Sequence, residues 1–121
     1  SGLQTRDFTY VSDVVGAFNV AHNSNISNEI FNVGSGNTIS VKRITNLLGG
    51  KKVYIRKRPG EPNCTFADIT KIMKKLKWKP KIKIEKGISI LLKEINYWQK
   101  APVWTPKKIN LATKDWFKFL K

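Results

Sequence analysis

The sequence has 121 residues, a formal net charge of +15 and 40% apolar residues, including four Trp and six Phe. This composition is not that of an intrinsically disordered chain, and no apolar run approaches the ~20 residues that a membrane-spanning helix needs. The single cysteine, Cys64, excludes an internal disulfide. We therefore expect a soluble, cytoplasmic protein with one domain over residues 1–121.

The positive charge is distributed unevenly along the chain. Residues 1–41 contain one basic and three acidic residues, whereas residues 42–121 contain 22 basic and five acidic residues. Such asymmetry can mark a nucleic-acid-binding surface. However, 19 of the 23 basic residues are lysines, many of them placed singly between apolar residues, and recognition of bases relies more on arginine. Nucleic acid is therefore the less favoured partner, kept as an alternative.

The first predicted elements are a strand and a helix. The run Phe8–Val11 has the composition of a short strand. Ser12 is the predicted N-cap of a helix over residues 13–22, with Asp13 favoured in its first turn by the helix dipole. We expect His22 to lie on the surface at the helix end. The apolar face of this helix follows from the three- to four-residue spacing of Val14, Val15, Phe18 and Ala21.

A second strand, Ile30–Val33, is predicted before the Gly34–Asn37 loop. A helix with Ser40 as its N-cap should follow and should end at Gly49 and Gly50. The order strand, Gly-x-Gly, helix is similar to a dinucleotide-binding loop. However, Ile39 stands in place of the third glycine, and no acidic residue follows at the ribose-binding distance. We therefore assign no cofactor to this loop.

The remaining chain is predicted to be mainly helical. A short strand over residues 53–55 should lead into a turn at 56–62, and Asp68 should cap a helix that ends at Leu76. A longer helix is predicted from about Ile84 or Glu85 to Trp98, and the C-terminal tail, residues 99–121, should contain a helix over 106–119. The fold class is therefore mixed α/β, rich in helix with short strands. The expected inward-facing residues are Ile72, Met73, Leu76, Ile88, Leu91, Leu92 and Ile95.

The sequence offers no catalytic constellation. One histidine and one cysteine cannot make a zinc site, and nothing near a nucleophile elbow supports a serine triad. We expect Cys64 to be a buried or half-buried inert thiol rather than a nucleophile. We therefore predict no catalytic residue, no metal site and no cofactor-binding residue in this chain.

Three side chains could instead form a binding site. Arg6 lies near a predicted strand end and helix start, and Arg58 precedes Pro59 in another loop; each can place two parallel N–H donors on a phosphate. Glu61, three residues after Arg58, could accept hydrogen bonds from the vicinal hydroxyls of a ribose. The alternative is that Arg6 pairs locally with Asp7 and that the arginines at 56–58 belong to a solvated turn.

Four sequence motifs carry a family resemblance. Residues 2–15 resemble the motif Gly-x-Gln-x-Arg-Asp-Phe-x-Tyr-Val-x-Asp-Val of the extended short-chain dehydrogenase/reductases that act on nucleotide sugars. The next three motifs of that family are matched, in order, by Phe-Asn-Val-Gly-Ser-Gly at 31–36, by Arg-Pro-Gly-Glu at 58–61 with Ala-Asp-Ile-Thr-Lys at 67–71, and by Leu-Lys-Trp-Lys-Pro at 76–80 with Glu-Lys-Gly-Ile at 85–88. The departures are Ser12, at a position that is often acidic, and Lys77, at a position that is usually glycine.

The resemblance implies roles for the same three side chains. In that family the arginine of the first motif and the arginine and acid of the third contact the nucleoside diphosphate of the substrate. These are Arg6, Arg58 and Glu61. The glycine loop at 34–36 would be structural. The resemblance also implies a homodimeric parent enzyme that acts on a UDP-sugar as an NAD-dependent epimerase or dehydratase.

The resemblance covers only part of such an enzyme. The glycine-rich NAD loop of the Rossmann domain is absent, and none of the three tyrosines has a lysine four residues later, as the family's catalytic pair requires. We therefore expect a C-terminal, substrate-binding portion, a fragment that starts within the first motif, binds no NAD and has no turnover alone. A free-standing nucleotide-sugar-binding module is the alternative, and the upstream coding sequence would distinguish the two.

Overall fold

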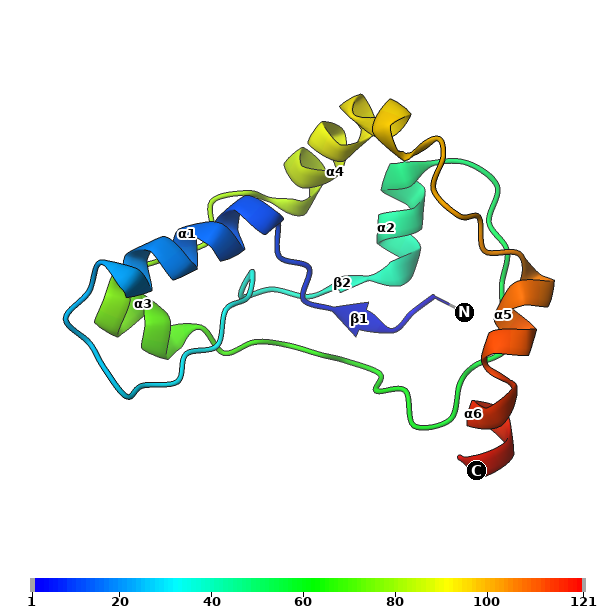
Figure 1. The fold of residues 1–121 in the computed structure, drawn as a ribbon, viewed down its shortest axis with the longest axis horizontal. Helices are drawn as coiled ribbons and strands as arrows, with labels where there is room; N and C mark the ends of the chain where they lie inside the picture. Colours follow the sequence, from blue (N-terminus) through cyan, green and yellow to red (C-terminus); the bar gives the residue numbers. More distant parts are fainter. Residues whose placement is uncertain (1, 121) are drawn as a thin grey trace.

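The computed structural model describes residues 2–120, which form an open arch of helices joined by long loops (Figure 1). Helices α1 and α3 lie together at one end, α2 and α4 lie in the middle, and α5 and α6 lie at the other end, near both termini. The elements, in chain order, are β1 (Thr5–Arg6), α1 (Val11–His22), β2 (Ile39–Ser40), α2 (Val41–Leu48), α3 (Thr70–Leu76), α4 (Ile84–Lys93), the 3₁₀ helix η1 (Ile95–Trp98), α5 (Pro106–Ala112) and α6 (Lys114–Phe119).

Strand β1 brings three distant segments together. It pairs antiparallel with β2, so that Thr5 lies opposite Ser40 and Arg6 opposite Ile39. Thr5 also forms a parallel bridge with Cys64: its N–H donates to the Asn63 carbonyl at 2.9 Å, and its carbonyl accepts from the N–H of Thr65 at 3.2 Å. The loop that precedes Asn63 is therefore held beside the first motif.

The predicted strands at Phe8–Val11, Ile30–Val33 and 53–55 are wrong. The first strand lies earlier, at β1, and the other two segments are loops. No backbone hydrogen bond among the described residues gives either of them a ladder partner. A strand needs such a partner, because its amide groups cannot pair within the segment. Apolar composition alone therefore predicted strands that residues 2–120 do not complete.

The helix starts show which capping predictions hold. Ser40 caps α2 as expected, since its hydroxyl accepts from the Arg43 N–H at 3.1 Å. Ser12 does not cap α1: the helix begins at Val11, two residues earlier than predicted, with Tyr10 at the cap position and no side-chain hydrogen bond there. Asp68 accepts from the Thr70 N–H at 2.9 Å, although Ile69 is the residue at the cap of α3. Lys77 adopts the left-handed conformation (φ 53°) at the end of α3, without the usual glycine.

Helices in the second half are shorter than predicted. The helix expected from 84 or 85 to 98 begins at Ile84 but is divided into α4 and η1, and the helix expected over 106–119 is divided at Thr113 into α5 and α6. Cys64 is exposed, so the prediction of a buried or half-buried thiol is wrong, whereas His22 is exposed as expected. Within residues 2–120 no helix is long and apolar enough to cross a membrane.

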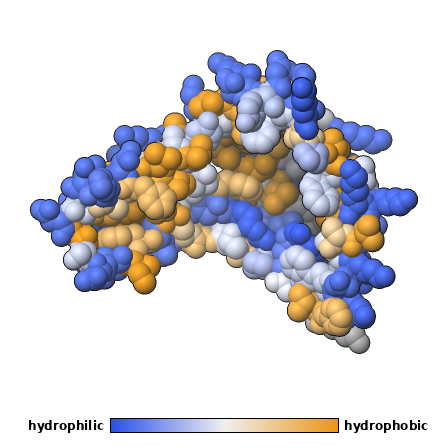
Figure 2. All heavy atoms as spheres, viewed as in Figure 1, coloured by the Kyte–Doolittle hydropathy of each residue, from blue (hydrophilic) through white to orange (hydrophobic). Residues whose placement is uncertain are grey.

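The hydrophobic core is small and lies between α1, α3 and the segment after α3. Its buried members are Ala17, Ile72, Leu76 and Trp78, with Phe31 and Ile69 packed against them. Several residues predicted to point inward are instead exposed, and Figure 2 shows apolar side chains at the surface over α1 and α3 and around the hollow of this face. These exposed residues are Val15, Phe18, Ala21, Met73, Leu91, Leu92 and Ile95.

The accessible surface area is large for a chain of this size. The described chain has 9865 Å² of accessible surface, whereas a compact monomer of 13.8 kDa would expose about 6,600 Å². The helices present amphipathic faces as the sequence predicted, but residues 2–120 supply too few partners to cover them. The apolar periodicity therefore predicts the helices correctly, but the prediction that their apolar faces are buried is wrong for the exposed residues named above.

Glu29 provides a titratable link between the loop after α1 and helix α3. Its carboxylate pairs with Lys75 and, at 2.7 Å, with Lys71. Hydrogen bonds from these two lysines lower the pKa of Glu29 from 4.5 to about 2. Because the pKa in the folded chain lies below the unfolded value, the stabilisation is present above about pH 4.5 and is lost as the pH falls towards 2.

We therefore expect Glu29→Gln to have a modestly lower melting temperature than the wild type at pH 7, because the ion pairs are exposed to solvent. The difference should shrink as the pH falls from 5 to 2. Thermal melts followed by circular dichroism across this range would check it. Glu94→Gln is the control, since Glu94 has no ion pair within residues 2–120. A difference that persists unchanged at pH 2 would show that the charge of Glu29 is not responsible.

Candidate functional site

The segment Arg58-Pro59-Gly60-Glu61 forms a tight turn. The N–H of Glu61 donates to the carbonyl of Arg58 at 3.4 Å, and Gly60 has a positive φ of 73°, which glycine adopts without strain. The turn places the two charged side chains side by side. Arg58 donates from Nη2 to Oε1 of Glu61 at 3.0 Å and from Nε to Oε2 at 3.4 Å. This forked geometry orients the guanidinium group.

Arg6 joins this pair from a segment 55 residues away. The pairing of β1 with residues 63–65 places its Nη2 atom 3.5 Å from Oε1 of Glu61. Its Nη1 atom donates to the carbonyl of Thr5 at 2.7 Å. Glu61 therefore lies between two guanidinium groups, and the structure brings together all three side chains that the sequence nominated.

The electrostatics of this cluster favour an anion. The side chains of Arg6 and Glu61 are each 21% exposed, so their interaction is only partly screened by solvent. The hydrogen bond from Arg58, followed by the positive charges of Arg58, Arg6 and Lys57, lowers the pKa of Glu61. The carboxylate stays ionised at neutral pH and neutralises one of the nearby cations. The others leave the cluster with a net positive charge.

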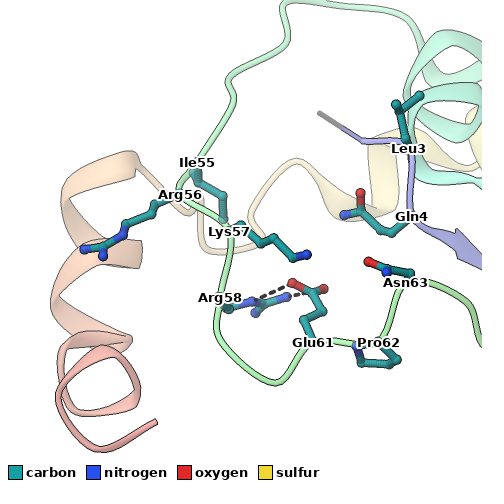
Figure 3. Close-up of a pocket in the computed structure, with 9 residues that line it drawn as sticks. All are labelled: Leu3, Gln4, Ile55, Arg56, Lys57, Arg58, Glu61, Pro62 and Asn63. Carbon is teal, nitrogen blue, oxygen red and sulfur yellow. Dashed lines mark hydrogen bonds and ion pairs between the residues drawn. The ribbon is translucent and has the colours of Figure 1, made fainter. Parts of the chain in front are cut away.

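A cavity of about 290 Å³ opens beside the turn. This is at the lower end of the range for small-molecule sites, about 300–1,000 Å³. Figure 3 shows Arg58 joined to Glu61, with Lys57 extended towards Gln4 and Asn63. Arg6 does not line the cavity and reaches it only through Glu61. The lining residues are Leu3, Gln4, Ile55, Arg56, Lys57, Arg58, Glu61, Pro62 and Asn63.

Asp7 has a different role from the one that local pairing with Arg6 would give it. Its carboxylate accepts from the backbone N–H groups of Ser35 at 2.6 Å, Gly36 at 3.2 Å and Ala67 at 3.4 Å. It therefore fastens the glycine loop and the 65–67 segment to the end of β1. The local pairing alternative is wrong for this structure, because Arg6 pairs with Glu61 instead.

Several lining residues were not nominated from the sequence. Gln4 and Asn63 line the cavity only because β1 pairs with the segment after Glu61. Lys57 lies in the basic turn at 56–58, from which only Arg58 was nominated. The signal available was the position of Gln4 inside the first motif and of Lys57 next to the third, but neither position indicates which way a side chain points.

Most of the chain matches the model of one protein family. The model described as GDP-mannose 4,6 dehydratase matches residues 1–91. The chain is also 36% identical over 117 residues to UDP-glucuronate 4-epimerase of Thermodesulfobacterium geofontis, covering 91% of this chain and 35% of that protein. The chain thus spans about a third of the length of the curated relatives it matches.

Two solved structures share the fold. A UDP-glucose 4-epimerase from Thermotoga maritima, with UDP-glucose, is similar with a TM-score of 0.73 and 32% identity, over 80% of this chain and 33% of that chain. A UDP-glucuronic acid 4-epimerase from Bacillus cereus, in complex with UDP-glucuronic acid and NAD, is similar with a TM-score of 0.72 and 28% identity, over the same shares. The helix-rich architecture with few strands therefore matches one part of these enzymes.

Proposed function

The chain belongs to the NAD-dependent epimerase/dehydratase family of extended short-chain dehydrogenase/reductases, and from this premise we propose that it binds the nucleoside diphosphate of a nucleotide-sugar substrate. The convergence of Arg6, Arg58 and Glu61 beside one cavity carries the proposal. The three come from two segments far apart in the sequence, and only the pairing around β1 brings them together. A UDP-sugar is the proposed substrate class, because the similar solved epimerases contain UDP-sugars.

Each side chain has a distinct proposed task. Arg58 retains an Nη1 group that donates to no acceptor within residues 2–120 and can therefore bind a phosphate oxygen. Arg6, which does not line the cavity, adds positive charge and forms an ion pair with the carboxylate of Glu61. Glu61, ionised at neutral pH, orients both guanidinium groups and can accept a hydrogen bond from a ribose hydroxyl. Together these contacts would hold the substrate by a part that does not react, which contributes to catalysis through orientation.

NAD does not fit the glycine loop of this chain. The loop N–H groups of Ser35 and Gly36, which could bind a pyrophosphate, are already satisfied by the Asp7 carboxylate. A Cβ atom at Gly34 would lie 2.4 Å from that of Ala67, so protein already fills the space beside the loop. We propose that NAD binds in the portion of these enzymes that this chain does not match. We expect no turnover by the chain alone.

Titration of the chain with UDP and with uridine by isothermal calorimetry tests the proposal. UDP should bind saturably and uridine much more weakly, because the arginines recognise the phosphates. Titration with duplex DNA at two salt concentrations tests the nucleic-acid alternative that the +15 charge raises. DNA binding with a steep salt dependence, together with no response to UDP, would contradict the proposal and favour the alternative.

A further inference from the structure

Helix α6 packs against the loop that carries the arginines. The indole Nε1 atom of Trp116 donates to the carbonyl of Pro59 at 2.9 Å. The guanidinium carbon of Arg58 lies 5.1 Å from the centroid of the Trp116 ring, and that of Arg56 lies 4.8 Å from the centroid of Phe117. Figure 3 shows Arg56 directed away from Glu61, towards the C-terminal helices. Two neighbouring aromatic residues thus contact two arginines of one loop.

We propose that Trp116 is a positioning residue of the diphosphate site and acts through Arg58. This inference rests on the proposed function. Glu61 accepts two hydrogen bonds from one edge of the Arg58 guanidinium group and so fixes its orientation. The ring of Trp116 lies within cation–π distance of the same group. The indole hydrogen bond to Pro59 holds the turn itself. Arg58 is therefore oriented before a ligand arrives, which reduces the conformational entropy lost on binding.

The position of Trp116 supports a role in the site rather than in the core. The residue is 38% exposed and lies outside the hydrophobic cluster around Trp78. The family model match ends at residue 91, so helix α6 lies beyond the region that the four motifs describe. The tail is thus a contribution to the site that the motifs did not indicate.

The test compares UDP affinity, measured by calorimetry, between the wild type and three tryptophan variants. Trp116→Leu should bind UDP about five- to tenfold more weakly, because it loses both the ring and the hydrogen bond. Trp116→Phe should lose less, about two- to threefold, because its ring still faces Arg58. Trp104→Leu is the matched control: Trp104 is 66% exposed in the same tail, makes no aromatic or hydrogen-bond contact within residues 2–120, and should leave the affinity unchanged.

A double-mutant cycle separates positioning from a general structural effect. In an Arg58→Ala background, Trp116→Leu should cause much less further loss, because the guanidinium group that Trp116 orients is absent. Full additivity would overturn the inference. Wild-type UDP affinity in Trp116→Leu would also overturn it, and a loss in Arg58→Ala would then leave the proposed function intact. If Arg58→Ala itself binds UDP normally, the proposed function fails.

A measurement without ligand tests the geometry directly. The indole N–H of Trp116, assigned by NMR from its absence in Trp116→Phe, should exchange with solvent deuterium more slowly than that of Trp104. The reason is its hydrogen bond to Pro59. Equal exchange of the two indole groups would overturn the inference, whatever the calorimetry gives.

Discussion

Replacing Arg58 with alanine is expected to weaken UDP binding about 10- to 150-fold. A hydrogen bond to a charged group contributes about 1.5–3 kcal/mol, which corresponds to that range of dissociation constants. The substitution also removes the bidentate partner of Glu61, so that its carboxylate would face the phosphates with Arg6 as its remaining ion-pair partner. Calorimetric titration of the wild type and the variant measures the difference.

Further substitutions show whether the loss comes from the specific geometry. Arg58→Lys keeps the charge but cannot form the planar fork, so its affinity should lie between those of wild type and Arg58→Ala. Arg6→Ala should also weaken binding, by less, because Arg6 reaches the cavity only through Glu61. Arg43→Ala is the control, since Arg43 pairs with Glu85 on exposed helices outside this cavity. An equal loss in Arg43→Ala would indicate non-specific attraction to the basic surface and contradict the assignment.

Replacing Gly34 with alanine is expected to destabilise the fold by about 1–3 kcal/mol, as overpacking does elsewhere. The new Cβ atom would lie 2.4 Å from the Cβ of Ala67 and 2.7 Å from Oδ2 of Asp7. Relief of that overlap requires the loop to move away, which would break the hydrogen bonds from Ser35 and Gly36 to Asp7. Thermal and urea unfolding followed by circular dichroism would measure the change.

Gly16→Ala is the matched control, with an expected effect of opposite sign. Gly16 lies inside α1, and its added Cβ would meet Nε1 of Trp78 at 3.6 Å, an ordinary contact. Alanine should stabilise the helix by about 0.5–1 kcal/mol, because it loses less backbone entropy than glycine. A Gly34→Ala variant as stable as the wild type would show that the glycine loop does not pack against Ala67 in solution.

Both predictions depend on β1 and on the residue that follows it. Asp7, which follows β1, holds the glycine loop in place, and Arg6, within β1, contacts Glu61. One strand of two residues therefore connects the structural loop to the binding cluster. The arrangement explains why a resemblance spread over separate motifs corresponds to a single site. It also gives the arginine and the aspartate of the first motif separate tasks.

The sequence by itself determined the local features. Ser40 and the paired glycines at 49 and 50 mark the ends of α2, because hydrogen bonding at a helix cap depends on the nearest residues. The charge types of Arg6, Arg58 and Glu61 made them candidates for a phosphate and ribose site, and the motif resemblance favoured these three residues over the alternative. The motifs also identified the family, which the model match over residues 1–91 shows.

Only the tertiary structure decided the features that depend on a partner. The segments at 30–33 and 53–55 have the composition of strands but form none, because a strand is completed by a neighbour and not by its own residues. Likewise, Phe18 and Leu91 follow helical periodicity but are exposed, because periodicity indicates an apolar face and not what covers it. The contact of Trp116 with Arg58 joins positions 58 residues apart, a proximity that only the folded chain creates.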